Sequence, residues 1–285
     1  MTSPSHAERA GLSAIKGHGT ENDFLLIPDL DGALSLSAGL VRALCDRHAG
    51  IGADGVLRVV RTKLASEPEV RSQADEAEFF MDYRNADGSA VEMCGNGVRV
   101  VGRYLQQAGL AGDGLKLATR GGVKTLHFDG DQITVAMGMA TVLPGTPMVN
   151  AGHAGTALVV PNPHVVVELA DERELAELDL RRPPSVKPPL PDGQNVEFFV
   201  RRGPNHVVMR VHERGVGETR SCGTGICAVA VVAAGERAGA GSWQVDLPGG
   251  RCTVGWAEDG SVTLSGPAVL VGEVTIGADW LAAHR

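Results

Sequence analysis

The chain has 285 residues, and its 26 lysines and arginines against 34 aspartates and glutamates give a formal net charge of −8. This acidic balance argues against nucleic acid as a partner, because no basic surplus exists to neutralise phosphates. Hydrophobic residues make up 43% and charged residues 21% of the chain, which is typical of a globular protein long enough for two domains.

The N-terminal stretch MTSPSHAERAGLSAIKGHG lacks the continuous apolar run of a secretory signal. No segment approaches the roughly 18 uninterrupted apolar residues of a membrane span, so we expect no membrane partner and a cytoplasmic location. We expect the first residues, about ten, to form a loose leader. The chain contains neither a P-loop nor a Rossmann fingerprint, which predicts that it uses no cofactor.

A short cysteine motif follows a strand-like segment in the first half of the chain. The sequence EFFMDYRN (78–85) predicts a strand, and EMCGNGVRV (92–100) places Cys94 directly before two glycines. Apolar Val98, Val101 and Leu105 recur at helical spacing and predict a helix over 98–107. The sequence GGVKTLHFDGDQITVAM, which follows, predicts short strands around GG and DG turns.

The second half repeats this order after a proline-rich stretch, RRPPSVKPPLPDG (181–193), which predicts an ordered loop with little room for helix or strand. HVVMRVHE (206–213) predicts a strand, and RSCGTGICA (220–228) carries the second cysteine motif. The segment ICAVAVVAA (226–234) is apolar all round, and its length and alanine content favour a buried helix. GGRCTVGWAEDGSVTLSG again predicts short strands.

A shift of 128 positions, from 94 to 222, superimposes the two halves without a gap. The shift brings together Cys94-Gly95-Asn96-Gly97 with Cys222-Gly223-Thr224-Gly225, Gly121-Gly122 with Gly249-Gly250, and 78–85 with 206–213. We interpret this as a duplicated domain of roughly 130 residues. A helix enclosed by strands in each half favours the α+β class over a parallel doubly wound sheet.

The odd number of cysteines, five, argues against a structural disulfide framework. We interpret Cys45, Cys227 and Cys252 as small buried hydrophobic residues. Cys94 and Cys222 are different, because a helix start offers unsatisfied N–H groups and a positive dipole end that stabilise a thiolate. The same N–H groups can bind an anion such as a carboxylate.

Two such devices facing one substrate carbon predict a racemase or an epimerase. One cysteine removes a proton as a thiolate, and the other returns a proton from the opposite face as a thiol. The alternatives are a tight packing site, a metal site using Cys222 and Cys227, and a thiol redox protein. The spacing of Cys222 and Cys227 is not C-x-x-C, so we expect no metal. A Cys94–Cys222 disulfide is physically reasonable as an oxidised, inactive form.

Five segments together resemble the diaminopimelate epimerase family: KGHGTENDF (16–24), DRHAGIGADG (46–55), RNADGSAVEMCGNGVR (84–99), NPH (162–164) and ERGVGETRSCGTG (213–225). The resemblance implies a cofactor-independent homodimer that interconverts LL- and meso-diaminopimelate for lysine and peptidoglycan-precursor synthesis. It implies two pseudo-symmetric domains, each a curved, mostly antiparallel sheet or barrel around a central helix, with the active site in the cleft between them. We assign 1–139 plus 270–285 to the first domain and 140–269 to the second.

The resemblance also implies residue roles, with Cys94 and Cys222 as the two catalytic bases and His164 as a supporting residue. The substrate-binding residues that it implies are Asn22, Asn85, Gly95, Asn96, Asn162, Asn195, Glu213, Arg214, Gly223 and Thr224. In this set Arg214 holds the distal carboxylate with its planar fork and Glu213 pairs with the reacting ammonium. Gly55 departs from the glutamine that many members of the family carry. A proline or hydroxyproline racemase is the nearest rival, and Arg214 with the asparagines argues against it by demanding a polar distal end.

Overall fold

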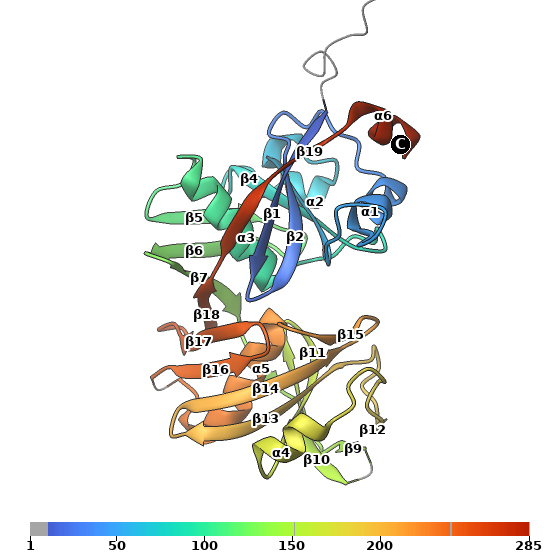
Figure 1. Cartoon of the computed structure of the whole chain (residues 1–285). Helices are drawn as coiled ribbons and strands as arrows, with labels where there is room; N and C mark the ends of the chain where they lie inside the picture. The colour runs from blue at the N-terminus through green and yellow to red at the C-terminus, as the bar shows by residue number, and fades with distance from the viewer. Residues whose placement is uncertain (1–10, 151, 240, 285) are drawn as a thin grey trace, which may run out of the picture. The chain divides into compact units, whose positions relative to one another are not determined.

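The computed structural model describes residues 11–150, 152–239 and 241–284, so the predicted leader lies outside the described residues. The chain divides into two compact units (Figure 1), of which the first contains residues up to 19, 23–126 and those from 268 onward. The second unit contains 20–22 and 127–267. The predicted division, 1–139 plus 270–285 and 140–269, and these units differ over 20–22, 127–139 and 268–269. Strand β7 (Gln132–Gly138) pairs with β18 (Val262–Pro267) in the second unit.

The first unit places helix α3 among strands from both ends of the chain. Strand β1 pairs antiparallel with β19, β2 runs parallel to β3, β3 antiparallel to β4, and β4 parallel to β5. Helix α3 contacts all of these strands except β2 closely. The elements are β1 (Leu12–Gly19), β2 (Asn22–Pro28), α1 (Ala38–Cys45), β3 (Gly55–Arg61), a 3-10 turn (Thr62–Leu64), α2 (Pro68–Arg71), β4 (Phe79–Asn85), α3 (Gly95–Gln107), β5 (Gly114–Ala118), β19 (Val269–Ile276) and α6 (Ala278–Ala283).

The second unit repeats this plan around helix α5. Strand β10 pairs antiparallel with β11, β11 runs parallel to β13, β13 antiparallel to β14, and β14 parallel to β16. Strand β6 (Lys124–Asp129) crosses from the first unit into the second. The remaining elements are β8 (Thr141–Val142), β9 (Met148–Val149), β10 (His153–Val160), β11 (Asn162–Glu168), α4 (Glu172–Glu177), β12 (Val186–Lys187), β13 (Asn195–Gly203), β14 (His206–Glu213), β15 (Gly217–Thr219), α5 (Gly223–Ala234), a 3-10 turn (Gly235–Arg237), β16 (Trp243–Leu247) and β17 (Gly250–Trp256).

The predicted α+β fold of two similar units is confirmed by this shared order of strands and helices. The predicted helix over 98–107 lies within α3, and the predicted helix over 226–234 lies within α5. The proline-rich loop contains one short strand, β12, which pairs with β9. Its backbone therefore has slightly more regular structure than its prolines suggest.

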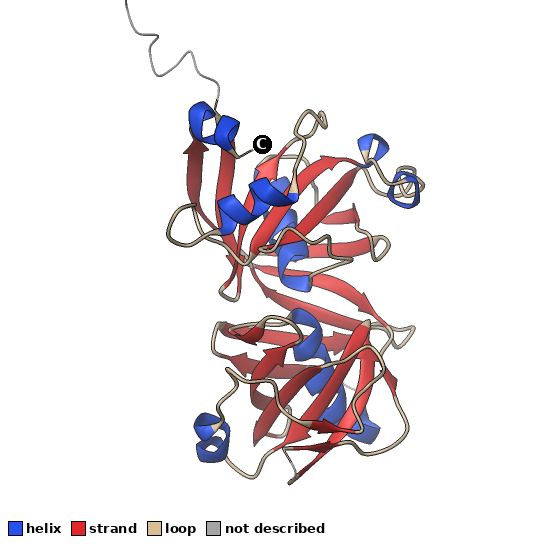
Figure 2. Ribbon diagram, turned by 90° about the vertical axis from the view of Figure 1, so that its right-hand side faces the viewer, coloured by secondary structure: helices blue, strands red, loops and turns tan. Residues whose placement is uncertain are grey.

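Helix α5 is enclosed on all sides, as Figure 2 shows for the helix flanked by strands in the second unit. Only Val232 among its residues is not buried. An amphipathic helix would leave a polar face in contact with strands, whereas the uniformly apolar sequence of α5 suits a position inside the unit. Helix α3 is less uniform, and its last turns carry partly exposed Arg103, Tyr104 and Gln106.

The register of β11 and β13 decides which side chains face α5. His164 pairs with Asn195, so His164 and Asn195 lie on the same face of the sheet together with Asn162 and Glu197, two positions along. The opposite face carries Val165, Val167, Val196 and Phe198, which pack with Leu175 of α4 in an apolar cluster. The strands thus separate an apolar outer layer from a polar set directed at the helix.

The described residues form no helix that is both long and apolar enough to cross a membrane.

Ile226, in the first turns of α5, is fully buried and tests the packing of this helix. Replacing Ile226 by Ala should lower the free energy of unfolding by about 2–5 kcal/mol, since deletion of a buried aliphatic group leaves a cavity. The matched change Ile51→Ala, at a side chain that is 39% exposed, should cost less than about 1 kcal/mol. Denaturant unfolding of both variants checks this, and equal costs would contradict the enclosed position of α5.

Candidate functional site

Both cysteine motifs form helix starts, as the sequence predicts. Cys94 is the N-cap of α3 and Cys222 is the N-cap of α5, each with extended backbone angles. Val98 N–H donates to the Cys94 carbonyl at 2.9 Å, and Ile226 N–H donates to the Cys222 carbonyl at 2.9 Å. As N-cap residues, both cysteines carry their thiols beside the N–H groups of the first turn.

The repeated glycines hold the segment that precedes each cysteine. Gly121 N–H donates to the Glu92 carbonyl at 2.9 Å, and Gly249 N–H donates to the Arg220 carbonyl at 3.0 Å. These two bonds are related by the same shift of 128 positions. A Cβ at position 249 would lie 1.9 Å from the Thr20 carbonyl oxygen, so that position admits only glycine. The repeat thus conserves the anchoring of the helix start as well as the cysteine.

Residues 20–22 belong to the second unit and support the approach to Cys222. Thr20 and Ser221 share a hydrogen bond of 2.6 Å between their buried hydroxyls, and Arg220 pairs with Glu21. Asn22 follows in the same segment and is half-buried. The structure therefore brings Asn22 into the unit that carries Cys222.

Cys222 is buried, with only 6% of its surface exposed. Burial raises the pKa of its thiol well above 9, and the nearby Glu213 and Glu197 carboxylates raise it further. The Thr224 hydroxyl, 3.4 Å from Sγ, and the Gly225 N–H lower the pKa without offsetting the burial. The expectation that a helix start stabilises a thiolate is reversed at this cysteine, because desolvation outweighs the helix end.

A polar chain runs along the inner face of β11 and β13. Asn162 Oδ1 lies 3.0 Å from His164 Nε2, and His164 Nδ1 lies 2.7 Å from Glu197 Oε1. The side chains of His164 and Glu197 are both fully buried. A Cβ at Gly225, in the first turn of α5, would lie 2.6 Å from Glu197 Oε1, so the helix start rests directly on this carboxylate.

Glu197 is absent from the residues predicted by the sequence. The available signal is the strand NVEFFV, in which one acidic residue occupies a position between Asn195 and Phe199 on the side that faces the helix. A charged residue is almost never fully buried unless it is paired. A glutamate among otherwise buried strand residues therefore indicates that Glu197 pairs with a polar residue of a neighbouring element.

Asn195, Glu213 and Arg214 come together at the end of β13 and β14. The Arg214 N–H donates to Asn195 Oδ1 at 2.9 Å, and the Thr219 hydroxyl donates to Glu213 Oε1. The Arg214 guanidinium is exposed, and it donates to the Asp192 carbonyl. Glu213 lies near Cys222, as its effect on the thiol shows.

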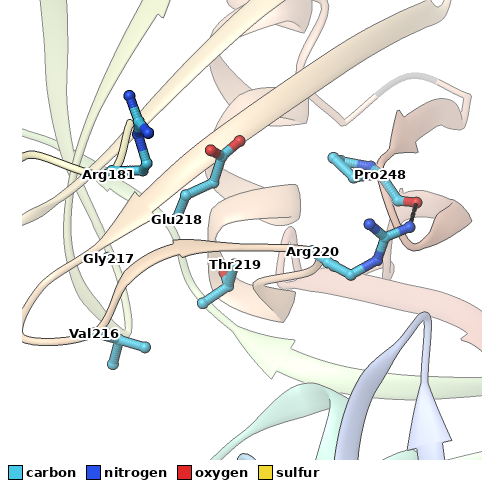
Figure 3. A pocket seen from close by; sticks show the side chains of 7 residues that line it. All are labelled: Arg181, Val216, Gly217, Glu218, Thr219, Arg220 and Pro248. Atoms are coloured by element: carbon cyan, nitrogen blue, oxygen red, sulfur yellow. Dashed lines mark hydrogen bonds between the residues drawn. The ribbon is translucent and has the colours of Figure 1, made fainter. Parts of the chain in front are cut away.

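Two cavities adjoin this end of the second unit. Arg214 borders one of about 400 Å³, together with Gln194 and His212. The other, of about 550 Å³, is shown in Figure 3, where Arg181 and Glu218 lie on one side and the Arg220 guanidinium donates to the Pro248 carbonyl at 2.8 Å. Cys222 lies outside the lining of both cavities, in keeping with its burial.

The predicted residues of the first unit gather near α3 and β4. Cys94 is half-buried, and the buried Asn96 accepts at Oδ1 from Arg99 Nη2 at 2.9 Å. Asn85 accepts at Oδ1 from the Tyr83 hydroxyl at 2.9 Å and donates to Ser89 Oγ at 3.3 Å.

Gly55 lies opposite Asn85 in the sheet. A Cβ at position 55 would lie 2.7 Å from Tyr83 Cε2 and 2.5 Å from the Arg84 carbonyl oxygen. The ring of Tyr83 thus occupies the space that a side chain at position 55 needs.

The amide oxygens of four predicted asparagines share one arrangement. Each accepts from a group of the protein: Asn85 from Tyr83, Asn96 from Arg99, Asn162 from His164 and Asn195 from Arg214. An amide whose oxygen is held in this way directs its NH₂ group elsewhere. The protein thus sets the direction of each amide, and in Asn85 the NH₂ group is already directed at Ser89 Oγ.

None of the five cysteines forms a disulfide, Cys94 and Cys222 included. Cys45, Cys227 and Cys252 are buried, which confirms their interpretation as small core residues. Among the described ranges, no cluster of three or more histidine, cysteine, aspartate or glutamate side chains is arranged to hold a metal ion.

The raised pKa of Cys222 predicts its alkylation profile. In the folded protein, the rate of alkylation of Cys222 by iodoacetamide, measured on its peptide, should keep increasing beyond about pH 9. In the urea-unfolded chain, the rate should level off above the ordinary pKa of a cysteine thiol, about 8.5. Glu213→Gln should move the profile to lower pH, because removal of a negative charge favours the thiolate. A native profile at or below that of the unfolded chain would contradict the dominant effect of burial.

Comparison with known proteins places these features in a family. The family model described as diaminopimelate epimerase matches residues 14–143 and 156–271. The diaminopimelate epimerase of Streptomyces coelicolor is 51% identical over 285 residues, covering 95% of this chain and 97% of the relative. That of Thermobifida fusca is 52% identical over 267 residues, covering 90% and 95%.

Solved structures share the fold at low identity. A phenazine biosynthesis protein of the PhzF family from Bacillus anthracis has a TM-score of 0.68 at 14% identity, covering 93% of this chain and 98% of its own. A probable proline racemase from Agrobacterium radiobacter has a TM-score of 0.64 at 16% identity and covers 93% of each chain. These likenesses concern the fold alone. From its family model, its relatives and its paired cysteine helix starts, the chain belongs to the diaminopimelate epimerase family.

Proposed function

We propose that this protein interconverts LL- and meso-diaminopimelate by removing and returning the proton on one α-carbon. The observation that carries the proposal is the pair of cysteines at the starts of equivalent helices, in a chain of the diaminopimelate epimerase family. The reaction supplies meso-diaminopimelate for lysine and peptidoglycan-precursor synthesis. It needs only acid–base chemistry, and we propose that it proceeds without a cofactor.

Inversion of the α-carbon requires two groups that act on opposite faces of it. One cysteine accepts the α-proton as a thiolate, and the other donates a proton from its thiol. The high pKa of Cys222 favours its protonated form in the free enzyme, so we assign the donor role to Cys222 and the base role to Cys94 in one direction. After turnover the two roles are exchanged, which is the state from which the reverse direction begins.

The reacting carboxylate carries part of the negative charge that develops as the proton leaves. We assign its binding to the first-turn N–H groups of Gly95 and Asn96 and of Gly223 and Thr224. Helix starts aimed at this charge stabilise the transition state more than the ground state. Glu213, held by Thr219, is the partner of the reacting ammonium.

The distal end of diaminopimelate carries a second carboxylate and a second ammonium. We assign the distal carboxylate to Arg214 and to the amide donors of Asn162 and Asn195, with Asn22 and Asn85 as further polar contacts. His164 supports this set through its contact with Asn162. A proline-type substrate has no such distal end and leaves these donors without a partner.

We propose that the enzyme is a homodimer and acts in the cytoplasm, both on the strength of the family resemblance. Sedimentation of the full chain tests the first point, with a mass of twice 29.7 kDa expected for the dimer.

The two-base mechanism makes a prediction about each cysteine. In deuterated water, the unmodified protein should epimerise diaminopimelate and introduce one deuterium at the inverted α-carbon. Cys94→Ala and Cys222→Ala should each lose epimerisation by a factor of at least about 100, since a catalytic proton-transfer group contributes about 100- to 10,000-fold. Chiral chromatography and mass spectrometry measure both quantities.

Cys227→Ala is the matched control, because Cys227 lies in the same helix and is fully buried in the core. It should keep near-normal activity. Retention of activity by a folded Cys222→Ala variant, with loss in Cys227→Ala, would refute the assignment.

Arg214 predicts the specificity of the distal site. Arg214→Lys should raise KM by about tenfold or more, because an ammonium cannot reproduce the bidentate fork of a guanidinium on a carboxylate. Arg173→Lys is the matched control, since Arg173 is exposed and pairs only with Glu177 one turn along α4. Steady-state kinetics on diaminopimelate checks both, and an unchanged KM in Arg214→Lys would place Arg214 outside the site.

A further inference from the structure

The two units fill one equivalent position in opposite ways. Leu57 pairs with Tyr83 in the first unit, and Glu197 pairs with Val211 in the second, where 83 and 211 are related by the repeat. On the neighbouring strands, Phe24 pairs with Gly55 and His164 pairs with Asn195. Positions 55 and 195 lie two residues before 57 and 197, so Phe24 and His164 occupy equivalent positions. The first unit therefore carries a buried phenylalanine and leucine where the second carries a buried histidine and glutamate.

The helix above each pair confirms this equivalence. The nearest atom to a Cβ at Gly97 would be Leu57 Cδ2 at 3.0 Å, and the nearest to a Cβ at Gly225 would be Glu197 Oε1 at 2.6 Å. Gly97 and Gly225 are also related by the shift of 128 positions. In both units a glycine of the first helical turn thus rests on the same strand position.

Stability alone does not explain the polar pair. Replacement of a buried ion pair by well-packed apolar residues is often neutral or stabilising, and the first unit forms the same architecture with Phe24 and Leu57. Glu197 is fully buried, and its Oε2 has no hydrogen-bond donor within the described part of the chain. His164 is therefore the group that balances this carboxylate.

Both ring nitrogens of His164 lie within hydrogen-bond distance of an oxygen. Nδ1 faces the Glu197 carboxylate at 2.7 Å, and Nε2 faces Asn162 Oδ1 at 3.0 Å. Both oxygens accept, so the arrangement is satisfied when the ring donates from both nitrogens. With its oxygen held by Nε2–H, Asn162 can offer only its NH₂ group to a ligand.

We propose that Glu197 is a positioning residue that acts through His164 to present the Asn162 amide as a donor to an acidic ligand. The proposal deepens the proposed function and rests on it for the identity of the ligand, the distal carboxylate of diaminopimelate. Without Glu197 the imidazole loses its second proton, and its bare Nε2 draws the Asn162 NH₂ group toward itself. The amide then turns its oxygen to the ligand and repels the carboxylate.

The charge state of His164 depends on the ionisable groups around it. Glu197 faces it from β13, Glu213 lies on β14, and α5 contributes Cys222 and Cys227.

Nitrogen NMR of the full chain tests the relay without any assay of activity. In protein labelled with 15N-histidine, the resonances of His164, identified by their loss in His164→Gln, should show hydrogen on both ring nitrogens. Glu197→Gln should give one unprotonated ring nitrogen under the same conditions. An unprotonated nitrogen in the unmodified protein would overturn the proposal, since Asn162 would then donate to His164.

Kinetics on diaminopimelate tests the consequence for binding. Glu197→Gln and Glu197→Leu should each raise KM by about tenfold with kcat changed less than about threefold, because an interaction with the distal end is lost equally in the ground and transition states. Glu197→Leu places at this position the residue type that the first unit carries, and thermal unfolding measured beside KM separates lost folding from lost binding. A merely structural role for Glu197 predicts normal KM in Glu197→Leu, and that result would overturn the proposal.

A double-mutant cycle with Asn162→Ala locates the effect. If Glu197 acts through Asn162, Glu197→Gln should add little to the KM of Asn162→Ala, whereas additive effects would refute the relay. Glu168→Gln is the control, since Glu168 lies on the same strand as His164, is exposed and pairs with Arg201. A protein that shows the doubly protonated His164 but no epimerisation would refute the proposed function and leave the relay standing, whereas an active enzyme with neutral His164 would refute the relay alone.

Discussion

Complete enclosure of helix α5 is the constraint on which the chemistry of the second unit depends. A helix that is apolar on every side can be surrounded by strands, and its first-turn N–H groups then lie in the interior with it. The residue that caps such a helix is removed from water as well. Cys222 therefore has a thiol whose pKa is set mainly by burial, with the helix end and the Thr224 hydroxyl as smaller opposing influences.

The duplication supplies the same frame twice, and the differences lie in what fills it. Both units have a cysteine before a glycine-rich first turn, and both tie the preceding segment to a later glycine by one backbone hydrogen bond. Below the first turn, one unit places Leu57 and the other places Glu197. The first unit forms this architecture with the apolar pair Phe24 and Leu57, so the fold does not require the polar pair His164 and Glu197. The polar pair is therefore available for the positioning role that we propose.

The direction of four asparagine amides is set by neighbouring groups of the protein. The asparagine amides have no fixed direction of their own, because oxygen and NH₂ are nearly the same size. Hydrogen bonds from Tyr83, Arg99, His164 and the Arg214 backbone hold the oxygens and so fix which end is offered. In the proposed function, the NH₂ groups of Asn162 and Asn195 are the ends offered to the distal carboxylate.

The sequence by itself determined the features that depend on local pattern. The glycine after each cysteine and the apolar run that follows placed both helix starts, and the shift of 128 positions indicated two similar units. The five motifs indicated the family, because they combine many residues in a fixed order. The general tendency of a cysteine to be a small buried hydrophobic residue led to the interpretation of Cys45, Cys227 and Cys252 as core residues, and their burial confirms this.

Only the tertiary structure decided the features that depend on pairing between distant segments. The register of β11 and β13 brings Glu197 to His164, 33 positions away, and the sequence carries no local sign of that register. The sequence indicated a thiolate at each helix start, whereas the degree of burial, which arises from the packing of many strands, makes Cys222 a thiol in the free protein. Strand β7 belongs to the second unit because it forms hydrogen bonds with β18 there, although the predicted division placed it in the first domain. Burial and strand pairing are properties of the folded chain as a whole, and no short segment encodes them.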